Sequence, residues 1–249
     1  MVPPFRLNPF AMSAPSYTYL ALGDSYTIGE GVPAADNFPS QTVRLLRAAG
    51  IPCSEPTIVA KTGWTTGELK EGILTRFPVS TQPIPPGARP PSPALPGITP
   101  DPVFDFVSLL IGVNNEYRGH SLEEYVVEFE ELLLRAIGFA GGLTAHVFVL
   151  SIPDWSITPF AHAHLPDKLG RGKAMVSDEI DAFNTAARRI ADRHRVDFID
   201  ITPHTRESGN SWLTTDLLHP SGREYGYWAG LLSAAIAGRC RQPTASGGQ

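Results

Sequence analysis

The chain has 249 residues, of which 42% are hydrophobic and 18% are charged, and its formal net charge at pH 7 is -5. This length and composition allow one large core, so we expect a single α/β domain. The acidic balance argues against nucleic acid as a partner, and the apolar runs are too short for a membrane-spanning helix, which needs roughly 20 residues.

Both ends of the chain are predicted to lie outside the domain. Prolines interrupt the N-terminal stretch MVPPFRLNPFAMSAPS, which contains no apolar core of signal-peptide length. We therefore expect a cytoplasmic protein with one domain over residues 17–240 and disordered extensions at 1–16 and 241–249. Two cysteines, Cys53 and Cys240, define neither a disulfide framework nor a metal site, so we expect free thiols.

Strand-like and helix-like segments alternate along the chain. Short runs rich in β-branched and aromatic residues predict strands at 17–23, 57–61, 103–111, 146–152 and 196–201. Helical spacing of apolar residues predicts helices over about 38–49, 65–76, 122–140, 172–194 and 221–238. Ser121 and Glu124 match a capping box at the start of the third helix. The alternation predicts a three-layer α/β/α sandwich with a flavodoxin-like, five-stranded parallel sheet in the order 2-1-3-4-5.

Residues 78–102 form a proline-rich segment that contains ten of the 24 prolines. We interpret it as a surface insertion and not as a linker between domains, because the two strands before it are too few for an independent core. Its position before the third predicted strand indicates the end of the sheet opposite the carboxyl ends of the strands. A direct role in chemistry is therefore not expected.

Ser25 directly follows the first predicted strand. Ligands of open parallel sheets bind beyond the carboxyl ends of the strands, so the Ser25 hydroxyl is expected at that rim, with its own N–H free to donate. Asp24 and Ser25 also fit an ordinary polar turn, so this segment alone does not establish catalysis.

Three later segments supply groups that suit a nucleophilic serine. Asp216 and His219 lie three positions apart in the loop before the last helix, where the carboxylate can fix the tautomer of the imidazole. Asn114 follows the third strand, and its amide can donate to an oxyanion. Gly63 follows the second strand, and its missing side chain lets a backbone N–H approach the same oxygen. The N–H groups of Ser25 and Gly63 and the Asn114 amide are thus predicted to converge.

Taken together, these segments resemble the SGNH hydrolases, also called GDSL-type esterases and lipases. The four blocks occur in order as GDSYTIGEG, KTGWTT, GVNNEYRG and DLLHPS. The resemblance implies Ser25 as nucleophile, His219 as general base and Asp216 as the acid that orients it. It also implies an oxyanion hole of Ser25, Gly63 and Asn114, and a mechanism that needs no metal or organic cofactor.

Two positions depart from the pattern of that family. Tyr26 stands where leucine usually follows the serine, and Asn115 stands where aspartate usually follows the asparagine. The aspartate resembles a support for the loop, so an amide at that position changes how firmly Asn114 is held. Asp24 is expected to anchor the turn and not to be the acid of the triad.

The substrate pocket is predicted from SIPDWSITPF, residues 151–160, which leaves the fourth strand and should overhang the site. Trp155, Ile157 and Phe160 would form its apolar wall, although packing in the core accounts for them equally well. The remaining pocket candidates are Asp24, Tyr26 and Asn115. The expected substrates are short- to medium-chain acyl esters or lysophospholipids, with a carbohydrate O-acetyl ester as the alternative.

Other classes of function have weaker support in the sequence. His162, His164 and Asp167 are fewer than the four ligands of a zinc site, so no metal is expected. A non-catalytic binding module on the same fold should lack a member of the triad, whereas all three residues are present. A nucleotide-binding flavodoxin relative would need a phosphate-cradling glycine pattern that GDSYTIGEG lacks. The oligomeric state stays open.

Overall fold

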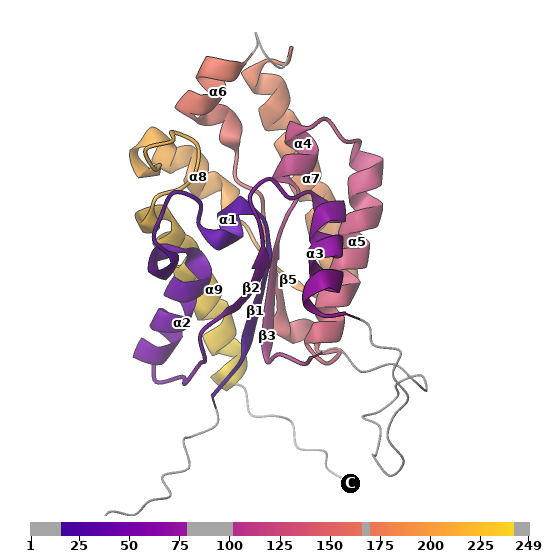
Figure 1. Cartoon of the computed structure of the whole chain (residues 1–249), viewed down its shortest axis with the longest axis vertical. Coiled ribbons are helices and arrows are strands. Elements are labelled where there is room, and N and C mark those ends of the chain that lie inside the picture. Colours follow the sequence, from indigo (N-terminus) through magenta and orange to yellow (C-terminus); the bar gives the residue numbers. More distant parts are fainter. Residues whose placement is uncertain (1–15, 79–101, 166–169, 242–249) are drawn as a thin grey trace, which may run out of the picture.

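One parallel sheet lies between two layers of helices in the computed structural model, which describes residues 16–78, 102–165 and 170–241 (Figure 1). Its strand order is β2-β1-β3-β4-β5, so the predicted fold class and order are confirmed. Nearly all of the proline-rich segment 78–102 and of the two predicted extensions lies outside the described residues. The strands are β1 (Tyr19–Gly23), β2 (Thr57–Ala60), β3 (Phe106–Leu110), β4 (Val147–Leu150) and β5 (Asp197–Ile199).

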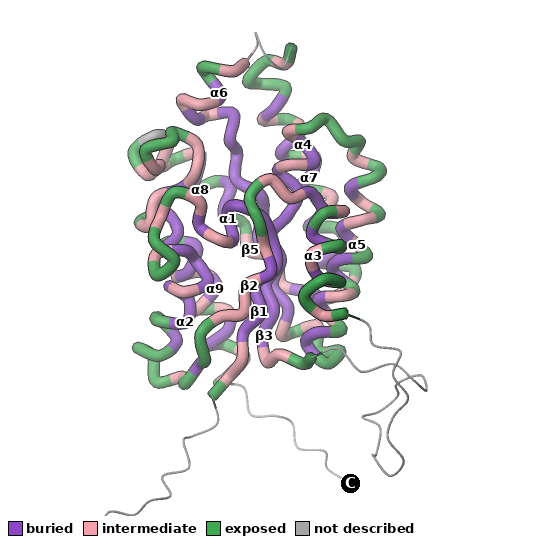
Figure 2. Tube along the Cα trace, viewed as in Figure 1, coloured by how far each residue is buried: buried purple, intermediate pink, exposed green. Residues whose placement is uncertain are grey.

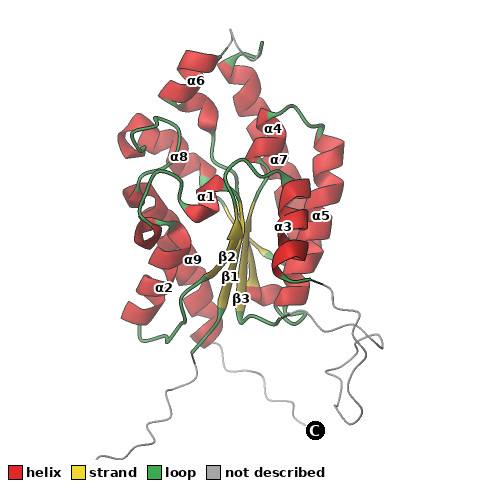
Figure 3. Cartoon of the chain, viewed as in Figure 1, coloured by secondary structure: helices red, strands yellow, loops and turns green. Residues whose placement is uncertain are grey.

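Long helices cover both faces of the sheet (Figure 3). On one face lie α2 (Phe38–Ala48) and α9 (Gly222–Arg241), and on the other lie α3 (Thr66–Arg76), α5 (Leu122–Phe139) and α7 (Lys173–Arg193). The five helices predicted from sequence are these five. Short helices gather beyond the carboxyl ends of the strands: α1 (Ser25–Ile28), α4 (Val113–Tyr117), α6 (Pro159–His164) and α8 (Thr202–Ser208), with short 3-10 turns at η1 (Ala34–Asp36), η3 (Trp155–Ile157) and η4 (Gly209–Trp212). A further 3-10 turn, η2 (Thr144–His146), leads directly into β4 and so lies at the opposite end of the sheet.

The core follows the central strands (Figure 2). Every residue of β1, β3 and β4 is buried, whereas the edge strands β2 and β5 are mostly half-buried. This is why the central strands read as uninterrupted apolar runs, as parallel strands covered on both faces do. Capping boxes fix where two helices begin, Thr65 with Glu68 at α3 and the predicted Ser121 with Glu124 at α5.

The register of the sheet brings the ends of three strands together. Gly23, the last residue of β1, pairs with Ala60 on β2 and with Leu110 on β3. The segments that follow these strands therefore leave the sheet together at the carboxyl ends of the strands, the upper end in Figure 1. Parallel α/β proteins bind ligands at this end of the sheet.

The segment with His162 and His164 forms the short helix α6, because Thr158 caps the helix and Pro159 occupies its first turn. Side chains two residues apart on a helix point roughly 200° apart. No group of three or more potential metal ligands occurs in the described parts of the chain. Cys53 and Cys240 are free thiols.

None of the helices within residues 16–78, 102–165 and 170–241 combines the length and apolar character needed to cross a membrane.

Alanine substitutions at Gly72 and Gly230 test the packing of the helices. A Cβ on Gly72, in α3, would lie 2.1 Å from the Trp64 ring, whereas no atom of the residues that the structure describes lies within 4 Å of a Cβ on Gly230, in α9. Gly72→Ala should lower the free energy of unfolding by about 1–3 kcal/mol through overpacking. Gly230→Ala should raise it by about 0.5–1 kcal/mol through helix propensity. Urea denaturation measures both, and two changes of the same sign would contradict the packing described.

Candidate active site

Three polar side chains from two distant parts of the chain form a hydrogen-bonded row at the upper end of the sheet. His219 Nε2 lies 3.0 Å from Ser25 Oγ, and His219 Nδ1 lies 2.7 Å from Asp216 Oδ2. Ser25 is only 5% exposed and lines a cavity together with His219. The structure thus brings together the three residues that the sequence assigns to nucleophile, base and acid.

Asp24 determines how β1 passes into α1. Its Oδ1 accepts a hydrogen bond from the Tyr26 N–H at 3.0 Å, which caps the helix that begins at Ser25. The anchoring role predicted for Asp24 is confirmed by this contact. The Ser25 N–H is the first of the helix, where no intrahelical acceptor exists.

The Asp216 carboxylate organises the loop before α9. Its Oδ1 accepts from Thr214 Oγ1 at 2.7 Å and from the N–H groups of Leu218 and His219, both at 2.9 Å. Leu217 has a φ of 63°, which a non-glycine residue rarely adopts. The turn bends sharply enough for Asp216 to reach both the backbone and the ring of His219.

The electrostatics of this loop fix the imidazole tautomer. Burial alone would raise the pKa of Asp216, but hydrogen bonds from Thr214, His219 and the backbone outweigh burial and lower the pKa to about 2. The carboxylate is therefore ionised at neutral pH and can only accept hydrogen bonds. The hydrogen between it and Nδ1 belongs to the ring, so in the neutral ring Nε2 is left to accept the hydroxyl proton of Ser25.

Asn114 on α4 and Arg118 directly after this helix contact the turn that carries Gly63. Asn114 Nδ2 donates to the Trp64 carbonyl at 2.9 Å and makes a long, 3.5 Å contact with Asp24 Oδ2. Arg118 Nη2 donates to the Gly63 carbonyl at 2.5 Å. Gly63 has a φ of 81°, which favours glycine. These contacts hold the Gly63 peptide and the Asn114 amide at the same end of the sheet as Ser25.

Asn115 also contacts the segment after β2, but inside the protein. Its Nδ2 donates to Thr66 Oγ1 at 2.6 Å, and its Oδ1 accepts from the Thr66 N–H at 3.0 Å. The Thr66 hydroxyl in turn donates to Glu128 on α5. Asn115 therefore joins α4 to the start of α3.

The cavity beside Ser25 has a volume of about 200 Å³. Three of the six pocket candidates, Tyr26, Trp155 and Phe160, line it. The full lining is Ser25, Tyr26, Thr62, Gly63, Val113, Asn114, Tyr117, Trp155, Phe160, Leu218 and His219.

The other three pocket candidates do not line this cavity. Asp24 and Asn115 are fully buried, because their polar atoms are used by backbone and side chains within the fold. Ile157 lies on a smaller adjacent cavity that also contacts Trp212. Asp24 and Asn115 are each next to a proposed site residue in the sequence, but this adjacency did not indicate that their side chains point into the protein.

Several wall residues were missed by the sequence analysis. Tyr117 is three positions after Asn114 and therefore lies on the same side of α4, a spacing that could have identified it. Thr62, Val113 and Leu218 are neighbours of motif residues and carry no signal of their own. The Tyr26 ring packs against the His219 imidazole at a tilt, with the two ring centroids 5.5 Å apart.

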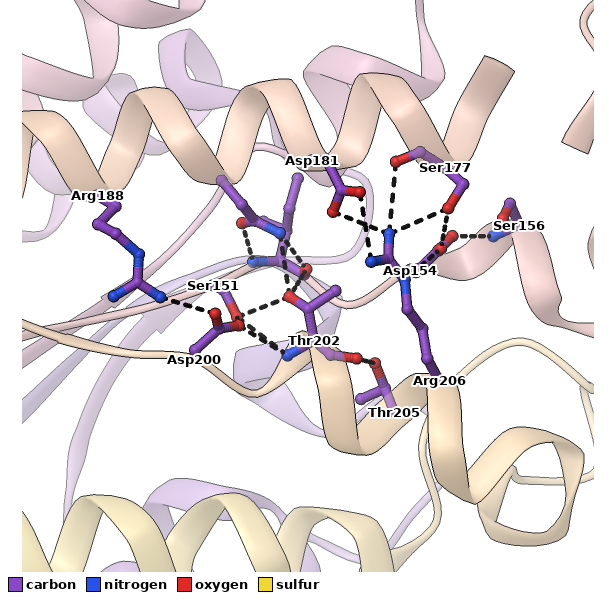
Figure 4. A network of polar contacts seen from close by, with 12 residues as sticks. Ser151, Asp154, Ser156, Ser177, Asp181, Arg188, Asp200, Thr202, Thr205 and Arg206 are labelled. Carbon is purple, nitrogen blue, oxygen red and sulfur yellow. Dashed lines mark hydrogen bonds and ion pairs between the residues drawn. The ribbon is translucent and has the colours of Figure 1, made fainter. Parts of the chain in front are cut away.

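Asp154 anchors the segment that carries Trp155. Its carboxylate accepts from Arg206 on α8 at 2.9 Å, from Ser177 on α7 at 2.7 Å and from the Ser156 N–H at 2.9 Å (Figure 4). Burial would raise the pKa of Asp154, but these donors lower it. The wall of the cavity is therefore tied to two helices.

Comparisons with known proteins show the family and agree with the fold. The GDSL-like lipase/acylhydrolase family matches residues 21–227, whereas no curated protein matches the chain. A lipase/acylhydrolase from Enterococcus faecalis has a similar structure, with a TM-score of 0.59, 18% identity and coverage of 90% of this chain and 96% of that chain. The esterase EstA from Pseudoalteromonas sp. has a TM-score of 0.59 and 12% identity, with coverage of 91% of this chain and 100% of that chain. The acetylxylan esterase Axe2 from Geobacillus stearothermophilus has a TM-score of 0.56 and 17% identity, with coverage of 91% of this chain and 95% of that chain.

The contact of Asn115 with Thr66 predicts the effect of restoring an aspartate. In Asn115→Asp the Thr66 hydroxyl faces two carboxylates, those of residue 115 and Glu128, and has one hydrogen to donate. We expect the free energy of unfolding to fall by about 1–3 kcal/mol, because one buried acceptor loses its donor. Glu128→Gln supplies a new N–H donor and should restore most of the loss in the double variant. Urea denaturation of the single and double variants measures both effects, and additive losses would contradict the contact network.

The burial of Asp24 predicts a pH-dependent stability. Burial raises its pKa from 3.8 to about 7, so between these values the folded chain binds more protons than the unfolded chain. The Asp24 contribution to the free energy of unfolding therefore falls as pH rises through this window. Asp24→Asn keeps the acceptor for Tyr26 but cannot titrate. In urea denaturation from pH 5 to 8, the free energy of unfolding of the variant should rise relative to that of the native chain as pH rises. A difference that stays constant over this range would refute the prediction.

Proposed function

Because this chain belongs to the GDSL-like lipase/acylhydrolase family, we propose that it is a serine esterase that hydrolyses carboxylic esters through an acyl-enzyme on Ser25. The observation that carries the proposal is the row in which His219 Nε2 lies 3.0 Å from Ser25 Oγ and Nδ1 lies 2.7 Å from Asp216. Both distances lie within the range that proton transfer and ring orientation require.

The proposed mechanism uses all three residues of the row. His219 removes the hydroxyl proton of Ser25 as the oxygen attacks the ester carbonyl, and the Asp216 carboxylate stabilises the resulting imidazolium. The alcohol leaves with the proton that His219 returns to it. Water, activated by the same ring, then attacks the acyl-enzyme and releases the carboxylic acid.

In this mechanism, three donors stabilise the charge that develops on the carbonyl oxygen. The Ser25 N–H has no intrahelical acceptor, and the positive φ of Gly63 turns its peptide away from regular structure. The Asn114 amide nitrogen carries two hydrogens; it donates to the Trp64 carbonyl at 2.9 Å, and its other contact, with Asp24, is 3.5 Å long. A contact of that length is weak, so the second hydrogen is available to the oxyanion.

The size of the cavity favours a short acyl group such as acetyl or butyryl. Its volume of about 200 Å³ lies below the range of roughly 300–1,000 Å³ that holds drug-sized ligands. Aromatic rings of Tyr117, Trp155 and Phe160 line it and suit an alkyl chain. The long chain of a lysophospholipid would have to extend beyond these walls.

A carbohydrate O-acetyl ester is the second candidate substrate. It places only an acetyl group in the cavity and leaves the sugar outside, so the small volume suits it equally. Among the similar structures are an acetyl-xylooligosaccharide esterase and an acetylxylan esterase. Release of acetate from acetylated xylan, compared with hydrolysis of p-nitrophenyl acetate, separates the two leaving groups.

Replacing the proposed nucleophile tests the function. Ser25→Ala should reduce hydrolysis of p-nitrophenyl acetate by about 10⁴-fold or more, because the acyl-enzyme cannot form. Ser233→Ala is the control, since that hydroxyl lies on α9 and donates to the Gly230 carbonyl, and it should keep the native rate. Both variants should unfold at native-like temperatures. Native-like turnover in folded Ser25→Ala would refute the assignment.

A further inference from the structure

A buried hydrogen bond holds one wall of the cavity. The Trp155 indole is 3% exposed, and its N–H donates to Glu116 Oε2 at 2.6 Å. The ring meets Tyr117 edge to face, with centroids 5.3 Å apart, and both rings line the cavity. The position of the indole, and with it the width of the cavity, depends on the Glu116 carboxylate.

Arg171 holds that carboxylate in turn. Its Nη1 donates to Glu116 Oε1 at 2.7 Å and to Glu179 Oε2 at 2.6 Å. The same guanidinium donates to the backbone carbonyls of Glu116 and Tyr117, at 3.2 and 3.1 Å. One cation therefore fixes the end of α4, the Glu116 side chain and, through it, the indole.

Stability alone does not account for a charged group at this position. Removing an ion from water costs several kcal/mol, and an apolar residue of similar volume often stabilises a protein as well as a buried ion pair does. Glu116 is 1% exposed, and burial raises its pKa above the usual value for a glutamate, against the effects of Trp155 and Arg171. What the carboxylate supplies and an apolar side chain cannot is a directional acceptor for the indole N–H.

We propose that Glu116, held by Arg171, is a positioning residue that sets acyl-chain specificity by fixing the Trp155 indole in the wall of the cavity. The proposal rests on the proposed esterase function. In this proposal, the ion pair between Glu116 and Arg171 keeps the cavity narrow, although its two residues lie 55 positions apart in the chain. Neither residue touches the acyl group; both act through the indole.

The test compares two esters in two variants. Glu116→Met keeps a similar volume, leaves Arg171 paired with Glu179 and removes the acceptor. The ratio of kcat/KM for p-nitrophenyl hexanoate to that for the acetate should rise by about 10-fold, within the range that added methylenes produce in an apolar pocket. Glu116→Gln keeps an acceptor for the indole and should return the ratio to within about twofold of the native value.

A second buried glutamate provides the matched control. Glu224 is 2% exposed and accepts from Trp228 Nε1 at 2.9 Å, but Trp228 does not line the cavity. Glu224→Met should leave the ratio unchanged even where it lowers stability. If Glu116→Met lowers kcat/KM equally for both esters, the proposal is overturned. If the native chain hydrolyses neither ester, the esterase function itself is refuted.

The indole N–H gives a readout that does not need activity. The chain has four tryptophans, and Trp155→Phe identifies the Trp155 signal in the ¹H–¹⁵N spectrum. That signal should move upfield in Glu116→Met and stay near its native position in Glu116→Gln. If Glu116→Met does not fold, Trp155→Phe also removes the donor and should raise the ester ratio; an unchanged ratio there would overturn the proposal.

Discussion

The four hydrogen bonds that Asp216 accepts determine the geometry of the candidate site. Those from Thr214, Leu218 and the His219 backbone bend the loop, and that from His219 Nδ1 fixes the ring. They also keep the carboxylate ionised, with its pKa lowered to about 2. Because the loop and the ring share one carboxylate, the orientation of Nε2 toward Ser25 is part of the fold of the loop.

The second constraint is the short helix α4, which connects the other blocks to one another. The turn after β2, which precedes α4 in the chain, is contacted by Asn114, Asn115 and Arg118. Glu116, on the same helix, is contacted by two residues that follow α4 in the chain, Trp155 and Arg171. One helix thus links the proposed oxyanion donors to the cavity wall. A substitution that breaks one of these contacts is therefore expected to shift the proposed oxyanion donors, the cavity wall or both.

Local sequence patterns were sufficient for the fold and for the residues of the hydrogen-bonded row. The strands are apolar runs with clear ends, and Ser25, Asp216 and His219 occur in short, ordered blocks. Patterns failed where the answer depends on long-range contacts. Asp24 and Asn115 were predicted on the pocket but are turned inward by Tyr26 and Thr66. The pairing of Glu116 with Arg171 joins residues that no local spacing connects.

Covalent labelling of the chain with diethyl p-nitrophenyl phosphate tests the central claim most directly. The hydroxyl that attacks an ester carbonyl also attacks this phosphorus, and the adduct survives for peptide mapping by mass spectrometry. The account predicts one diethylphosphoryl group per chain, on Ser25, and a much slower reaction when Asp216 is replaced by asparagine. No adduct, or an adduct on another residue while Ser25 stays unmodified, would contradict it.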